Sequence, residues 1–131
     1  MADTIELEVA TPSRELVREA VTDVQIPGKD GYLGILPGHA ALLGLLGTGA
    51  LAYSSGGRKK YLAVQGGFVE VLPEQVRVLA DIAERADDID VARAKADLSR
   101  AEAEETGADP DGALQAVALA QARIEAAQHR G

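Results

Sequence analysis

The sequence feature that most constrains the fold is a change of composition near Ala83. Before this point, valine, leucine and isoleucine recur in short runs that glycine and proline separate. After it, alanine dominates, and the large aliphatic residues that remain are Ile89, Val91, Leu98, Leu114, Val117, Leu119 and Ile124. Short apolar runs favour strands, whereas alanine favours helix. We therefore predict a β domain over residues 1–84 and a helical part over residues 85–131.

The first half alternates with a period of two, which is the pattern of a half-buried strand. Ile5, Leu7 and Val9 share one face of residues 4–10. Further strand-like runs cover residues 16–26, 51–53, 61–64, 68–72 and 76–80. Between two of them, Gly66-Gly67 predicts a tight turn or a bulge. Short strands at this spacing predict an antiparallel β-sandwich or a barrel.

Residues 28–39 form a stretch with four glycines, one proline and His39. Glycine permits positive φ, and proline fixes its own φ and restricts the residue before it. We therefore expect a loop of defined shape between strands.

The second half has apolar residues at helical spacing in two segments. The first stripe is Ala92, Ala96, Ser99 and Ala103, and the second is Ala113, Val117, Ala120, Ile124 and Ala127. Between them, Gly107 is suited to end one helix, Asp109 to cap the next, and Pro110 to occupy its first position. The pattern predicts a two-helix hairpin, so the whole chain is predicted to be α+β.

Burial of apolar surface stabilises a contact by roughly 25 cal/mol per Å². Because an alanine side chain buries little apolar area, a contact made of alanines is weaker than one made of leucines. Two interpretations of the hairpin follow from the residues alone. Either it is an ordinary helical layer on the sheet, or it is held loosely enough to open.

Composition excludes several classes of function. The chain has 21 acidic and 13 basic residues, so a basic nucleic-acid surface is not expected. It has no cysteine for a disulfide or a cysteine zinc site. Its most apolar stretch, residues 40–52, is shorter than the roughly 20 residues of a spanning helix, so we expect no direct membrane insertion.

No catalytic residues and no metal ligands are predicted. His39 has no nucleophile–base arrangement near it in the sequence, and we interpret it as a structural or interface histidine. His129 lies near the end of the chain, where we expect fraying. The basic run at residues 56–60 is interpreted as a solvated hairpin end.

Three motifs, in this order, resemble those of a known family. They are residues 31–43 with Leu-Pro-Gly-His, residues 66–71 with Gly-Gly-Phe-Val-Glu-Val, and residues 84–94 with Ile-Asp-Val-Ala-Arg-Ala. Together they resemble the epsilon subunits of bacterial F-type ATP synthases, and the resemblance spans the whole chain.

The resemblance implies an N-terminal β-sandwich, a hairpin that moves between folded and extended states, and a subunit that is not an enzyme on its own. The partners would be the gamma subunit, the c-subunit ring, and the alpha and beta subunits. As part of the central stalk, the chain would couple proton flow to ATP synthesis. It would lie at the cytoplasmic face of the bacterial cell membrane through the complex. The extended hairpin would brake ATP hydrolysis, with Arg85, Arg93, Arg100 and Arg123 meeting an acidic surface on beta.

The third motif also bears on nucleotide binding. By itself, the series Asp90, Arg93, Asp97 and Arg100 falls on one helical face and predicts surface ion pairs. By resemblance, no cofactor is required, but ATP would be a regulatory ligand. Glu84, Ile89, Asp90 and Ala94 would meet adenine, and Arg93 and Arg100 would approach the phosphates.

The second helix departs from the family pattern. Gln121 and Glu125 stand where ATP-binding members carry arginines, and Arg123 alone is available. Fewer cations predict modest affinity for ATP.

The resemblance also implies that the loop meets the c ring or gamma, through Asp30, Gly31, Tyr32 and His39. Tyr32 departs from the acidic residue that is frequent in the family. The alternative to a stalk subunit is a free-standing nucleotide-sensing protein with a β domain and a ligand-responsive hairpin.

Overall fold

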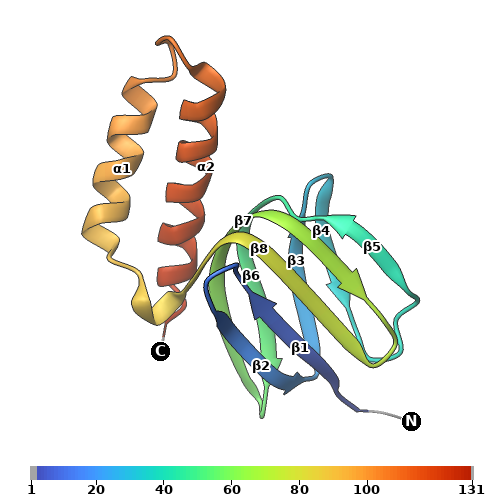
Figure 1. Cartoon of the computed structure of the whole chain (residues 1–131). Helices are drawn as coiled ribbons and strands as arrows, with labels where there is room; N and C mark the ends of the chain where they lie inside the picture. Colours follow the sequence, from blue (N-terminus) through green and yellow to red (C-terminus); the bar gives the residue numbers. More distant parts are fainter. Residues whose placement is uncertain (1–2, 131) are drawn as a thin grey trace.

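The computed structural model describes residues 3–130 (Figure 1), so Met1, Ala2 and Gly131 of the predicted ranges lie outside the described residues. Within them the chain forms eight strands, one short 3-10 helix and two α-helices. They are β1 (Ile5–Ala10), β2 (Glu15–Val21), β3 (Asp23–Gly28), β4 (Gly31–Ile35), β5 (Leu42–Leu45), β6 (Thr48–Ser55), β7 (Arg58–Val71), β8 (Gln75–Arg85), η1 (Ala86–Asp88), α1 (Val91–Ala103) and α2 (Pro110–Ala127). The predicted α+β class, with strands first and a helical hairpin second, is confirmed.

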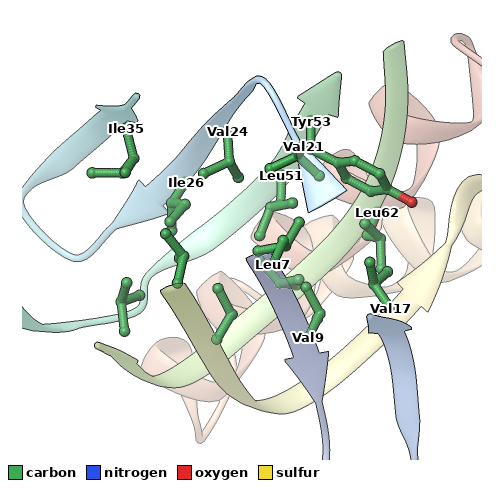
Figure 2. Close-up of a cluster of buried hydrophobic side chains, with 14 of the residues drawn as sticks. Leu7, Val9, Val17, Val21, Val24, Ile26, Ile35, Leu51, Tyr53 and Leu62 are labelled. Carbon is green, nitrogen blue, oxygen red and sulfur yellow. The ribbon is translucent and has the colours of Figure 1, made fainter. Parts of the chain in front are cut away.

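The strands hydrogen-bond in the order β2-β1-β8-β7-β6-β3-β4, and β5 pairs with β7. β1 and β8 are parallel, and the other pairs are antiparallel. β7 is long enough to pair with β6 along its first part and with β5 along its last part. The sheet folds over on itself, so all strands except β5 contribute side chains to one apolar core within the described part of the chain (Figure 2).

The predicted inward face of β1 is confirmed, because Ile5, Leu7 and Val9 are buried in this core. Val76 and Val78 of β8 are also fully buried. At roughly 1.5–3 kcal/mol for each large aliphatic side chain, the core dominates the stability of the β part.

Gly66-Gly67 forms neither the predicted tight turn nor the predicted bulge. β7 continues through both glycines, and its register with β8 is the same before and after them. Both glycines have positive φ. A Cβ at Gly67 would lie 2.0 Å from the carbonyl oxygen of Leu79. The glycine pair is therefore a distortion inside a strand, which lets β7 approach β8 closely.

The stretch at residues 28–39 is only partly a loop. β3 and β4 form a hairpin whose last paired residues are Gly28 and Gly31. Residues 36–41 then form a loop, in which the N–H of Gly38 donates to the carbonyl of Pro73 at 2.9 Å. Sequence reasoning did not identify β4 and β5, because glycine interrupts the apolar alternation in both.

The two helices form the predicted hairpin, with α2 against β6 and β7 and with α1 against α2 (Figure 1). Six alanines and Ile89 make up the buried cluster between hairpin and sheet. The alanines are Ala50, Ala63, Ala86, Ala122, Ala126 and Ala127. The interface thus has the small apolar area that the composition predicted.

The predicted inner stripe of the first helix is wrong. Ala94 and Ala101 are buried in α1, whereas Ala92, Ala96, Ser99 and Ala103 are exposed. Alanine occurs on every face of this helix, so its spacing does not identify the side that packs. The second stripe is better placed, because Ala113, Ala120 and Ala127 are buried.

The start of α2 follows the predicted capping, but Gly107 does not end α1, which stops at Ala103 with Glu104 as its C-cap. Asp109 Oδ1 accepts a hydrogen bond from the N–H of Gly112 at 3.0 Å, and Pro110 is the first residue of α2. Asp90 caps α1 in the same way, through the N–H of Arg93 at 3.0 Å.

Candidate functional site

One arginine of α2 connects three parts of the molecule. Arg123 Nε donates to Glu84 Oε1, at the end of β8, at 2.8 Å. Its Nη1 donates to Asp97 Oδ2, on α1, at 3.4 Å. The Arg123 side chain is only 16% exposed, so these bonds are partly shielded from water. This network fixes the hairpin to the sandwich by charge as well as by packing.

A groove of about 210 Å³ runs between the two helices beside this network. Arg100 and Arg123 line it together with Asp97 and Glu104. Arg100 also pairs with Asp97, so one carboxylate receives both arginines. An entering phosphate would have to replace that carboxylate as their partner.

The structure brings together three of the seven residues predicted to bind ATP: Glu84, Arg100 and Arg123. Ile89 and Ala94 are 3% and 0% exposed, so neither presents a free surface to a base. Arg93 is exposed on α1, where Asp90 accepts a hydrogen bond from its backbone N–H. The predicted face is therefore closed by the packing of the hairpin.

The residues predicted to contact the c ring or gamma are not gathered in one place. Asp30, Gly31 and Tyr32 lie at the start of β4, and His39 lies beyond its end. His39 is half-buried, and its Nδ1 lies 2.7 Å from the carbonyl oxygen of Ala40.

The side chain of Tyr32, on β4, reaches across the neighbouring strand β3 to Gly49 of β6. A Cβ at Gly49 would lie 2.5 Å from its hydroxyl oxygen. Partial burial raises the pKa of Tyr32, and the charge of Glu125 on α2 adds to the effect. The tyrosine therefore lies where the β3–β4 hairpin approaches the helices.

An exposed apolar row was not identified from the sequence. Leu45, Phe68 and Leu79 are opposite one another across β5, β7 and β8, and are 49%, 56% and 44% exposed. We call these three residues the outer apolar row. The alternation of residues 68–72 puts Phe68 on the face opposite Val69 and Val71, and this was the signal available in the sequence.

The expectation that His129 is frayed is wrong. Its ring stacks on Tyr61 of β7, with 4.1 Å between the ring centroids. Arg130 Nη1 donates to the carbonyl of Ile89 at 3.1 Å. The end of α2 is thus fixed against the sandwich.

Among residues 3–130, no group of three or more acidic or histidine side chains is placed to hold a metal ion. In the same part of the chain, no helix is long and apolar enough to cross a membrane.

Comparison with known proteins decides the family. Residues 4–86 match the family described as ATP synthase, Delta/Epsilon chain, beta-sandwich domain. The chain is 58% identical to the ATP synthase epsilon chain of Solibacter usitatus, over 99% of this chain and 100% of that one. The chain belongs to the ATP synthase epsilon family. The epsilon chain of Koribacter versatilis is 53% identical, over 78% of this chain and 72% of that one.

Chains of solved ATP synthase structures share this fold. A chain in the Euglena gracilis mitochondrial ATP synthase, in a structure that includes the c-ring, superposes with a TM-score of 0.84 at 25% identity. It covers 98% of this chain and 84% of that one. A chain from the central stalk and c-ring of the Tetrahymena thermophila enzyme has a TM-score of 0.62 at 16% identity, over 92% of this chain and 96% of that one, which shows the fold alone. The predicted resemblance to epsilon subunits is confirmed.

Proposed function

We propose that this chain is the epsilon subunit in the central stalk of an F-type ATP synthase, where it couples proton translocation to ATP synthesis. It performs no catalytic step itself. The observation that carries the proposal is the 58% identity over the full length of a bacterial epsilon chain, hairpin included. Through its partners in that complex, the chain would lie at the cytoplasmic face of the bacterial membrane.

The exposed side chains indicate which surfaces contact the partner subunits. The outer apolar row presents three large side chains to solvent, next to an ion pair between Arg77 and Glu70 at 3.9 Å. Exposed apolar groups with a polar rim are typical of protein interfaces. We assign this row to gamma, and the turn at Asp30 and Gly31, with His39, to the c ring.

The hairpin is proposed to act as the brake on ATP hydrolysis. Its contact with the sheet consists mostly of alanine, and each buried methyl contributes about 0.8 kcal/mol. Release of the helices therefore breaks few large apolar contacts, but it also breaks the bond from Arg123 to Glu84 and the stack of His129 on Tyr61. The extended hairpin would then bring Arg85, Arg93, Arg100 and Arg123 to an acidic surface on beta.

A second proposal concerns ATP as a regulatory ligand of the hairpin. Glu84, Arg100 and Arg123 adjoin the groove between the helices, which supports it. Both arginines already pair with Asp97. Binding would require them to exchange this partner for phosphate, so the affinity is expected to be modest.

The deciding experiment measures ATP hydrolysis by a bacterial alpha–beta–gamma head. The full chain, or a version that ends at Asp87, is added. Binding of both to gamma, with inhibition by the full chain alone, would establish the stalk and the brake. If both bind and neither inhibits, the brake proposal is wrong. If neither binds gamma, the free-standing nucleotide sensor becomes the better explanation.

A further inference from the structure

A cavity of about 560 Å³ lies where the end of α2 meets the β6–β7 turn. Several separate parts of the chain line it, including Tyr53 of β6. Arg58, Lys59, Lys60 and Tyr61 come from β7. Arg85 is the last residue of β8 and Asp87 lies in η1, and His129 and Arg130 follow α2. Its volume is in the range of small-molecule sites.

The charge of this cavity is opposite to that of the protein. The chain has a formal net charge of −8, yet five lysines and arginines and one histidine line the cavity, with Asp87 as the lining acid. Two further acids form ion pairs with lining cations: Glu19 with Lys60 at 3.1 Å, and Asp88 with Arg85 at 3.5 Å. A local excess of positive charge therefore remains.

Several of these cations have no acidic partner within the described residues. Arg58, Lys59 and Arg130 take part in no ion pair there. Arg130 donates to the neutral carbonyl of Ile89. In the groove between the helices, by contrast, Asp97 already takes both arginines. The cavity is thus better supplied with available positive charge than the groove.

An aromatic pair borders the same cavity. Tyr61 stacks on His129 at 4.1 Å, and Lys59 Nζ lies 5.8 Å from the centre of the Tyr61 ring. The stack fixes the end of the hairpin beside the basic turn. The cations of β7 and Arg130 therefore line the same cavity when the hairpin is docked, and they separate when it is released.

We propose that this cavity binds a phosphate-bearing anion, either an inorganic polyphosphate or the phosphate chain of a nucleotide. Arg58, Lys59 and Arg130 supply the charge, and guanidinium groups suit phosphate oxygens geometrically. Because the site exists only when His129 and Arg130 lie against the sandwich, the bound anion favours the docked hairpin by mass action. The site shares no residue with the groove between the helices.

The test uses the full chain and isothermal titration calorimetry with pyrophosphate at low salt. The double variant Arg58→Ala/Lys59→Ala is expected to weaken binding at least tenfold. Neither side chain is buried, and the turn is formed by Gly56 and Gly57 at positive φ, so the fold is kept. Arg130→Ala tests the same site from the other side and is expected to weaken binding severalfold.

The matched control is Arg14→Ala/Lys29→Ala, which removes the same charge from two other exposed turns and should leave binding unchanged. Absence of pyrophosphate binding, or equal loss in the control, would overturn the proposal. So would loss in Arg93→Ala/Arg100→Ala with binding retained in Arg58→Ala/Lys59→Ala.

Competition by ATP distinguishes the two sources of phosphate. Displacement of pyrophosphate by ATP assigns the site to nucleotides, and no displacement assigns it to inorganic anions. Hydrogen exchange over residues 122–130 should slow at least threefold with saturating pyrophosphate. Unchanged exchange would refute the coupling to the docked hairpin.

Discussion

Arg123 of α2 donates from Nε to Glu84 Oε1 at the end of β8, across 2.8 Å. The same guanidinium reaches Asp97 of α1 at 3.4 Å. One side chain therefore holds both helices to the sandwich. It is also the single arginine of the second helix on which the predicted ATP site depends, so docking and the proposed binding of ATP would compete for it.

Replacement of Arg123 by alanine should loosen the hairpin. Glu84 would lose its partner while only 28% exposed, and we expect docking to weaken by about 1–2 kcal/mol, between the values for surface and buried pairs. Hydrogen exchange along α2 measures this. Arg100→Ala is the control, because that side chain is 65% exposed and its loss should cost below about 0.5 kcal/mol. Equal effects of the two changes would contradict a special role for Arg123.

The variant Asp97→Asn tests where ATP binds. Asp97 pairs with both Arg100 and Arg123, and the amide removes its charge at nearly the same volume. If ATP occupies the groove between the helices, affinity should rise severalfold because two arginines become available to phosphate. Titration calorimetry measures the change. Unaltered affinity, with ATP still bound, would place the nucleotide elsewhere.

A separate prediction concerns the alanine contact between the hairpin and the sheet. Ala126 is fully buried against the sheet, and leucine in its place would overpack the contact by about 1–3 kcal/mol. We expect α2 to leave the sheet while the sandwich stays folded, which small-angle scattering would record as a larger radius of gyration. Ala96→Leu, on the exposed side of α1, should have no such effect.

Much of this arrangement was predictable from the sequence because it follows from local periodicity. The inward face of β1 and the cap of α2 depend on neighbours in the chain, and both were predicted correctly. The inner face of α1 was not, since alanine lies on all its sides. The stack of His129 on Tyr61 joins residues 68 positions apart, and no local pattern encodes such a contact.

The outer apolar row also escaped prediction for a physical reason. Leu45, Phe68 and Leu79 come from three strands, and only the pairing register aligns them. Each single exposed apolar residue is unremarkable, and the surface arises from their alignment.

Phe68→Lys should disrupt the proposed gamma contact. Phe68 is already 56% exposed, so the stability of the isolated chain should change by less than about 0.5 kcal/mol. Affinity for gamma should fall at least tenfold, as expected for the loss of a central aromatic side chain. Surface plasmon resonance with immobilised gamma checks this. Leu114→Lys, at a similarly exposed position on α2, serves as the control, and an equal loss there would refute the assignment.

Gly67→Ala should destabilise the sandwich more than any of these changes. Gly67 has φ +116, and its added Cβ would lie 2.0 Å from the carbonyl oxygen of Leu79 on the paired strand β8. Backbone strain of this kind costs about 1–3 kcal/mol, and the clash adds to it, so we expect a loss of about 3 kcal/mol or more in urea unfolding. Gly34→Ala is the matched change, because a Cβ there meets nothing within 4 Å. A near-neutral result at Gly67 would mean that β7 and β8 can separate locally. It would contradict the conclusion that the glycine pair is needed for the close approach of the two strands.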